Sequence, residues 1–287
     1  QASGPKPGRP RGAGCCPPRA MGAGHPCRSC TEDGEVVDVP VTQVKPSEHR
    51  ERRPPHEYER RVVYTGEWLG EKREGHGVQT WADGARYEGQ WIQDRAHGQG
   101  KFFHAAGEVY EGSWQNDKAH GHGTYTHLDK SQYMGQWYAD KQHGEGTEIW
   151  PDSTKYVGQY KNGVKHGKGH FYWSDGSTYD GDFESNEMSG PGTYVWADGR
   201  TYAGQWLRNR MHGEGYFTWS DGRAFTGQYQ EDVKHGEGKF TWPDGRVWEG
   251  QWQEGKQHGF GTYTTTSGQA KQGEWVEGRR IRWIEGK

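Results

Sequence analysis

The sequence has few of the aliphatic side chains that build most protein cores. Only 29% of its 287 residues are hydrophobic, and much of that share is aromatic, with 15 Trp and 16 Tyr. Low hydrophobicity alone is typical of disordered chains, but such chains are also poor in aromatic residues. The sequence therefore predicts a folded chain with an aromatic core.

Long apolar runs and a marked excess of one charge are also missing. No apolar run approaches the 18 residues of a membrane-spanning helix, and no signal-peptide core is visible. Residues 1–62 carry 11 basic and 8 acidic side chains, and the remainder carries 25 and 31. Proteins that bind nucleic acid or anionic membranes show basic stripes. We predict no nucleic-acid partner and no transmembrane segment, and keep peripheral membrane contact open.

Catalytic signatures are absent as well. The sequence has no G-x-x-x-x-G-K-[ST] phosphate loop, no G-x-S-x-G and no H-E-x-x-H. Its Asp and His residues recur at fixed intervals, so they form no unique catalytic constellation. We predict that the chain is not an enzyme and holds no cofactor.

Cysteine is absent after residue 30. The candidate zinc ligands before that point are Cys15, Cys16, His25, Cys27 and Cys30. Zinc prefers two spaced pairs of such ligands, whereas the first two cysteines are adjacent. We therefore expect no metal site and interpret the thiols as incidental members of a Gly/Pro-rich leader.

The N-terminal region leaves two alternatives open, of which the first concerns the segment "MGAGHPCRSC" (21–30). If translation began at Met21, Gly22 would be exposed for lipidation, although Pro26 stands where Ser or Thr is usual. Because the sequence starts at Gln1, an organellar location after removal of a targeting segment is an alternative to the cytoplasm, cytoskeleton or cilium.

A repeat of 23 residues occupies most of the chain. Its tyrosine or equivalent ring stands at 64, 87, 110, 133, 156, 179, 202, 225 and 248. Counting this ring as position 0, Gly occupies position 2, a ring position 4, His-Gly positions 10 and 11, Gly position 13 and Asp-Gly positions 19 and 20. A tenth start at Lys271 keeps Gly273 and Trp275. A fixed period is the signature of a repeat array.

Alternation within each repeat predicts two strands. In "YEGQW" (87–91), positions 0, 2 and 4 share one face of a strand. Asp-Gly predicts the tight turn, and "QDRAHG" (93–98) the longer connection, with its His as a turn residue. We predict an all-β fold, an elongated single-layer antiparallel meander of stacked hairpins.

The rings gather on one face of this predicted sheet. Positions 0, 4, 15 and 17 hold 31 of the 39 aromatic residues. Gly at positions 2, 11 and 13 removes side chains beneath them, so we expect each ring to lie over bare backbone.

The pattern YxGxWxxxxxHGxGxxxxxDGxx resembles the MORN repeat (membrane occupation and recognition nexus) over roughly three quarters of the chain. The resemblance implies a β-hairpin array. From the residues themselves we place it over 64–275, as nine repeats and a degenerate tenth, after a Gly/Pro-rich, low-order arm at 1–62 and before a C-terminal tail or cap at 276–287. The resemblance also implies a broad set of roles, because relatives include radial-spoke and other ciliary proteins, cytoskeletal scaffolds, junctophilin-type membrane tethers and regulatory arms of enzymes.

We expect a partner to cover part of the aromatic face, because monomers rarely expose a long apolar strip. The predicted partner groove consists of Tyr87, Trp91, Tyr110, Trp114, Tyr133, Trp137, Trp173, Trp196, Tyr202, Trp206, Trp219, Trp242 and Trp252. Trp275, Trp283, Ile281 and Ile284 suggest a cap or a homodimer contact.

Two classes of function follow. The first is a structural scaffold that docks and spaces proteins in a large assembly, such as a cilium, an axoneme or another cytoskeletal complex, or as an accessory subunit of an organellar membrane complex. The second is a membrane tether that holds phospholipid, which the acidic repeats disfavour.

Overall fold

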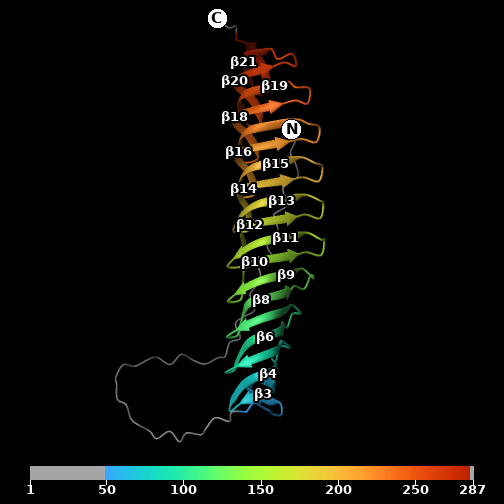
Figure 1. The fold of residues 1–287 in the computed structure, drawn as a ribbon, viewed down its shortest axis with the longest axis vertical. Coiled ribbons are helices and arrows are strands. Elements are labelled where there is room, and N and C mark those ends of the chain that lie inside the picture. The colour runs from blue at the N-terminus through green and yellow to red at the C-terminus, as the bar shows by residue number, and fades with distance from the viewer. Residues whose placement is uncertain (1–48, 285–287) are drawn as a thin grey trace, which may run out of the picture. The chain divides into compact units, whose positions relative to one another are not determined.

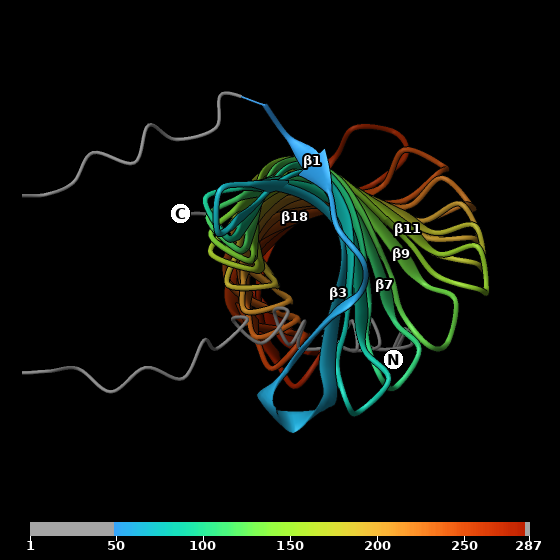
Figure 2. The same cartoon turned by 90° about the horizontal axis from the view of Figure 1, so that it is seen from below.

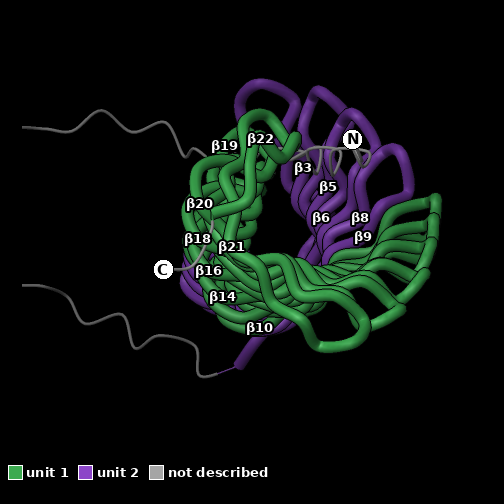
Figure 3. Tube along the Cα trace, turned by 90° about the horizontal axis from the view of Figure 1, so that it is seen from above, with its two compact units in different colours: residues 1–13, 143–287 green, residues 14–142 purple. Residues whose placement is uncertain are grey.

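The computed structural model describes residues 49–284 as β-strands and one short 3₁₀ helix. Contacts divide these residues into an N-terminal unit up to Gln142 and a C-terminal unit from His143, shown in purple and green in Figure 3. No helix in the described range has the length and apolar character needed to cross a bilayer. The predicted zinc ligands, Gly22 and Met21 lie outside the described residues.

The N-terminal unit is an antiparallel meander in which successive strands pair from β3 to β9 (Figure 1). Its elements are β1 (Glu51–Arg52), β2 (His56–Tyr58), η1 (Glu59–Arg61), β3 (Val62–Leu69), β4 (Lys72–Thr80), β5 (Arg86–Ile92), β6 (Arg95–Phe103), β7 (Val109–Gln115), β8 (Lys118–Thr126) and β9 (Gln132–Tyr138). In the end-on view of Figure 2, β3, β7 and β9 fan out, as the twist of a sheet requires.

The C-terminal unit continues the same pattern, and the boundary falls inside β10 (Lys141–Ile149). Its further strands are β11 (Lys155–Lys161), β12 (Val164–Tyr172), β13 (Thr178–Glu184), β14 (Glu187–Val195), β15 (Thr201–Leu207), β16 (Arg210–Thr218), β17 (Ala224–Gln230), β18 (Val233–Thr241), β19 (Val247–Gln253), β20 (Lys256–Thr264), β21 (Ala270–Val276) and β22 (Arg279–Trp283). Each pairs with its neighbours in sequence. The predicted all-β hairpin meander is confirmed.

The structure extends the array beyond both predicted ends. Low order was predicted for all of 1–62, but β1 and β2 pair with the outer edge of β3 and cover it. An open strand edge carries unsatisfied backbone groups, which this pairing satisfies. At the other end, β22 completes a tenth hairpin with β21 inside the segment for which a tail or cap was predicted.

The tight turn and the longer loop of each hairpin lie at the opposite connections from those predicted. The tight turn follows position 5, where Gln93 and Asp94 adopt φ of 48° and 67°. Positive φ at both central residues matches a type I′ hairpin turn. The Asp-Gly sequence instead lies in the longer loop, in which Trp81 N–H donates to Ala85 O at 2.9 Å. His97, predicted in a turn, belongs to strand β6.

The rings form the core in the way that the glycines suggested. Tyr87 is fully buried above Gly89 and Gly100, and its hydroxyl donates to Gln90 O at 3.0 Å. Trp91 meets Tyr87 edge to face, with centroids 5.1 Å apart. Burial raises the pKa of Tyr87, so its hydroxyl stays protonated and remains a donor.

Glycine at position 11 has another role than the predicted one. Gly98 has φ of 67°, a left-handed conformation that side chains disfavour. A Cβ there would meet the side chain of Gln90, which accepts a hydrogen bond from Gln99 N at 2.7 Å. Glycine at position 11 therefore allows the left-handed backbone conformation. The rings lie over the glycines at positions 2 and 13.

Where position 7 is Asp or Asn, a side-chain clasp joins the repeat to the one before it. Asp117 in the turn of one repeat accepts a hydrogen bond from Ala96 N at 2.7 Å, while Asp117 N donates to Ala96 O at 3.0 Å. Asp94, Asp140, Asn186, Asn209 and Asp232 make the same pair of bonds. Position 7 thus stabilises contacts between repeats as well as its own turn.

Candidate functional site

The predicted partner groove is mostly interior. Its rings at positions 0 and 4 are Tyr87, Trp91, Tyr110, Trp114, Tyr133, Trp137, Tyr202, Trp206 and Trp252, and all nine are 0–7% exposed. The expectation that these rings form an exposed apolar strip is wrong, because neighbouring repeats cover them. Tyr87, for example, also packs edge to face against Trp114 of the next repeat, with centroids 5.1 Å apart.

The other four predicted groove residues stand at position 17 and remain half-buried: Trp173, Trp196, Trp219 and Trp242. Trp173 shows how they lie, since its ring contacts Phe171 at 4.4 Å and Tyr194 at 4.9 Å between centroids. These indoles close the side of the core next to the long loops. Their contact with a partner stays a prediction.

A groove lies instead on the opposite face of the N-terminal unit. Every strand pair from β3 to β9 sets one glycine opposite another, as in Gly89↔Gly100 and Gly100↔Gly112. The resulting glycine floor consists of Gly66, Gly77, Gly89, Gly100, Gly112, Gly123 and Gly135. It crosses the strands as a band without side chains, inside a cavity of about 1070 Å³.

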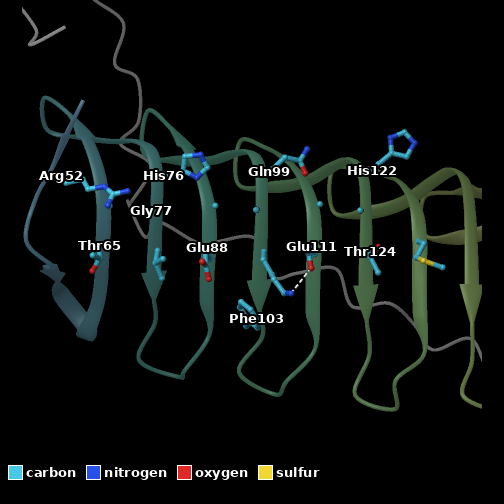
Figure 4. A pocket seen from close by; sticks show the side chains of 18 of the residues that line it. Arg52, Thr65, His76, Gly77, Glu88, Gln99, Phe103, Glu111, His122 and Thr124 are labelled. Carbon is cyan, nitrogen blue, oxygen red and sulfur yellow. Dashed lines mark ion pairs between the residues drawn. The ribbon is translucent and has the colours of Figure 1, made fainter. Parts of the chain in front are cut away.

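Two rows of side chains, most of them polar, border the floor (Figure 4). Position 12 supplies the His/Gln wall, which consists of His76, Gln99 and His122, all exposed. Positions 1 and 14 supply the Thr/Glu wall, which consists of Thr65, Val78, Glu88, Lys101, Glu111, Thr124 and Met134. The groove was not predicted from the sequence, in which its signal is the register of the glycines at positions 2 and 13.

Hydrogen bonds orient the His/Gln wall. The amide of Gln99 donates to Ser113 Oγ at 2.9 Å in the next repeat. Its backbone N–H donates to Gln90 Oε1 in its own repeat. Similar bonds recur in the C-terminal unit, where Gln228 donates to Glu214 at 3.0 Å. Gln99 is therefore held in place by its neighbours within this wall.

The charges of the groove are loosely paired. Lys101 Nζ lies 2.9 Å from Glu111 Oε2, and Arg86 lies 2.6 Å from Glu88. These side chains are between 40% and 65% exposed. Exposed ion pairs contribute about 0–1 kcal/mol, so either carboxylate can accept a new cationic partner at little cost. Arg52, 82% exposed, lies at the end of the groove next to β3.

Position 9 places a cation among the rings in some repeats. Lys165 Nζ lies 2.6 Å from Glu148 Oε2, with both side chains 7% exposed, and Tyr160 donates to the same carboxylate oxygen at 3.1 Å. Lys234 instead lies 4.7–5.1 Å from four ring centroids, those of Trp219, Phe225, Phe240 and Trp252. Desolvation by burial lowers the pKa of Lys234 to about 8.

Metal and dimer predictions remain separate from this groove. In the part of the chain that the structure describes, no three His, Cys, Asp or Glu residues come together as a metal site would require. At the C-terminal end, Trp275 is buried and packs against Trp283 with centroids 6.0 Å apart, whereas Ile281 is 60% exposed. A homodimer through this end stays a prediction.

Comparison with protein families gives one match, to the model of the MORN repeat. It matches nine consecutive segments, at 64–86, 87–109, 110–131, 133–155, 156–178, 179–199, 202–222, 225–245 and 248–270. These coincide with the hairpin pairs from β3 to β20. The comparison with curated proteins gave no match.

Solved structures resemble the chain only weakly. The TCP domain of SAS-4 (dCPAP) from Drosophila melanogaster is 9% identical, with a TM-score of 0.34, covering 70% of this chain and 99% of that one. The TCP10 domain of Danio rerio CPAP is 14% identical, with a TM-score of 0.25 and coverage of 73% and 99%. Virginiamycin B lyase from Staphylococcus aureus is 10% identical, with a TM-score of 0.14 and coverage of 78% and 69%. None bears on the function of this chain.

Proposed function

The chain belongs to the MORN repeat family, and from this premise we propose that it is a non-catalytic scaffold whose groove docks a segment of another protein. The glycine floor of the N-terminal unit is the observation that carries this proposal. It offers a long side-chain-free surface between two walls of hydrogen-bonding groups. Long concave surfaces are what repeat proteins use to bind partners.

A protein partner fits this groove better than a lipid surface. The walls mix carboxylates, cations, imidazoles and amides, as in Glu88, Lys101 and Gln99. Anionic headgroups attract clustered Lys and Arg, whereas the repeats carry more acidic than basic residues. Mixed polar walls suit a peptide, which presents both donors and acceptors along its length.

The assembly that we propose for this scaffold is cytoskeletal or ciliary. This part of the proposal rests on the resemblance to relatives in radial spokes and other cytoskeletal structures. A fluorescently tagged chain is expected to co-localise with axonemal or cytoskeletal tubulin. A diffuse or organellar distribution would contradict the location and leave the docking function standing.

Site-specific cross-linking in cell extract tests the docking function. A photoreactive phenylalanine analogue at Gln99 faces the groove, and the same analogue at Glu184, an exposed residue of β13, is the matched control. We expect Gln99 to cross-link reproducibly to a defined segment of one partner, identified by mass spectrometry, and Glu184 not to do so. Equal, non-specific labelling at both positions would reject the groove as the docking site.

Binding to vesicles separates the membrane alternative. Vesicles of phosphatidylcholine with and without phosphatidylinositol bisphosphate are sedimented with the full chain. We expect the chain to stay in the supernatant in both cases. Co-sedimentation that depends on the phosphoinositide, together with no groove-specific cross-link, would favour the membrane tether.

A further inference from the structure

We propose that the groove of the N-terminal unit accepts a polyproline II segment of its partner, with a basic residue at every third position. This inference rests on the proposed docking function and specifies the conformation and charge of the docked segment. It follows from the spacing of the repeat and from the placing of Glu88 and Glu111 in one wall.

The period of the groove matches that of polyproline II. Each repeat contributes two strands to the floor, and neighbouring strands lie about 4.8 Å apart, so chemically equivalent wall residues recur every ~9.6 Å. Polyproline II has three residues per turn and rises ~3.1 Å per residue, so the same side of the peptide returns every ~9.3 Å. Over three repeats the two periods differ by ~1 Å, which flexible side chains absorb.

Other regular conformations do not match. An extended β-strand rises ~3.3 Å per residue and presents the same side every second residue, or every ~6.6 Å. An α-helix repeats its turn every 5.4 Å, so two turns of ~10.8 Å slip by more than 3 Å over three repeats. Either ligand would meet equivalent wall residues at a different angle in each repeat.

The walls carry the groups that such a peptide lacks. Polyproline II has no internal hydrogen bonds, so its carbonyl oxygens need outside donors. His76, Gln99 and His122 provide one imidazole or amide side chain per repeat along one wall. One row of peptide carbonyls can therefore meet one wall side chain per repeat.

The groove also holds the cations Arg52, Arg53 and Lys101, so the basic positions are argued from its two carboxylates alone and not from its net charge. Glu88 and Glu111 both occupy position 1 in successive repeats, so they lie two strands apart in the Thr/Glu wall. A cation at every third peptide residue reaches both carboxylates. It replaces the exposed partners Arg86 and Lys101, which cost little to release.

Binding of three labelled nonapeptides to the full chain tests the inference by fluorescence anisotropy. (Pro-Pro-Arg)₃ has the predicted conformation, period and charge. A reordered peptide of six Pro followed by three Arg keeps conformation and charge but loses the period. (Gly-Ser-Arg)₃ keeps period and charge but loses the conformation. We expect the first peptide to bind at least about tenfold more tightly than either control.

A paired variant locates the binding. Glu88→Gln with Glu111→Gln is expected to weaken binding of (Pro-Pro-Arg)₃ about tenfold. Glu249→Gln, at position 1 of a repeat in the C-terminal unit, is expected to leave it unchanged. Thermal unfolding checks that all variants fold. Equal binding of the three peptides, or no effect of the paired variant, would overturn the inference, whereas a groove-specific cross-link to a proline-free segment would overturn it and preserve docking.

Discussion

At the scale of single residues, position 9 decides how the aromatic interior is filled. It holds Lys165 in one repeat and Met188 in the next, and the facing position 15 of the preceding repeat holds Glu148 and Phe171 respectively. The same space thus accepts either a buried ion pair or an apolar pair. Such pairs are costly to break singly, because the remaining charge stays buried without its partner.

Lys165→Met is therefore expected to lower the free energy of unfolding by about 3–5 kcal/mol. Adding Glu148→Phe gives these two positions the residues that the next repeat has there, the buried Phe171 and Met188, and we expect it to recover most of that loss. Chemical denaturation followed by tryptophan fluorescence measures both variants. A double variant no more stable than the single one would show that the carboxylate is not the source of the cost.

Lys234 lies among aromatic rings and has no salt-bridge partner among the described residues. No carboxylate therefore offsets the free energy that desolvation of its charged amine costs. Its pKa of 10.5 in the unfolded chain falls to about 8 in the folded one, so below pH 8 the amine is charged in both states and folding bears the full cost of desolvating that charge. Lys234→Met, which copies Met211 of the preceding repeat, is expected to raise stability at pH 7. In the wild type, the folded state binds the proton of Lys234 less tightly than the unfolded state does. The free energy of unfolding of the wild type therefore rises with pH between about 8 and 10.5. The advantage of the variant then shrinks.

Thermal unfolding at pH 7, 8, 9 and 10 measures this difference. Lys239→Met, at an exposed site of the same strand β18, is the control. Its difference from wild type is expected to stay constant over the same pH range. A constant difference for Lys234→Met as well would contradict the assignment of the lowered pKa to this amine.

At the scale of the hairpin, two kinds of glycine have distinct functions. A Cβ on Gly89 would lie 2.5 Å from Gly100 Cα and 2.6 Å from both Gln99 O and the Tyr87 hydroxyl. Gly70, with φ of 60°, has open space around it and occupies the turn position where Asn116 stands in another repeat. At Gly89, contacts with neighbouring atoms exclude a side chain. At Gly70, only the left-handed backbone conformation restricts the residue.

Gly89→Ala is expected to cost at least about 3 kcal/mol, because the backbones of two paired strands and a buried ring must all shift. Gly70→Asn is expected to change stability by less than about 1 kcal/mol, because Asn tolerates the left-handed conformation. Urea denaturation of the two variants compares them directly. A tolerated Gly89→Ala would show that the sheet can separate at the floor without loss.

The sequence allowed most of the hairpin to be predicted, because strand alternation and ring positions are local features. The assignment of the two turns was wrong, since Asp-Gly fits several turn types and Gln93-Asp94 carries no glycine to mark its positive φ. The groove could not be predicted from composition, because it depends on the register that sets glycine opposite glycine between strands. Burial of Tyr87 depends on the next repeat and that of Trp91 on the preceding one, which alternation alone does not describe.

At the scale of the whole chain, the structure is a series of contacts between neighbours. From β3 onward, every strand within a unit pairs with those adjacent in sequence, and clasps such as Asn209 with Met188 N link consecutive repeats. The stability of such an array is approximately a sum over repeats and their interfaces. Removing one complete period leaves each remaining interface of the same type.

Deletion of residues 202–224 is therefore expected to give a folded chain, because Asp232 then meets Met188 N in place of Asn209. We expect its melting temperature to lie within about 5 °C of that of the full chain. Deletion of residues 202–213 removes most of β15 and part of β16 without restoring the 23-residue period. It is expected to unfold the segments that follow. Circular dichroism and thermal melts compare the two; equal losses would argue against nearest-neighbour stability.

The clasp at position 7 also has a polarity, because each turn reaches back to hold the hairpin made before it. A newly synthesised hairpin therefore locks its predecessor as it emerges, and the last one to form is the least secured. Where Gly255 and Gly278 stand at this position, the backbone bonds to Lys234 O and Gln257 O persist but the side-chain oxygen is gone. We expect the last two hairpins, whose turns lack this oxygen, to open before those that an Asp or Asn clasp holds.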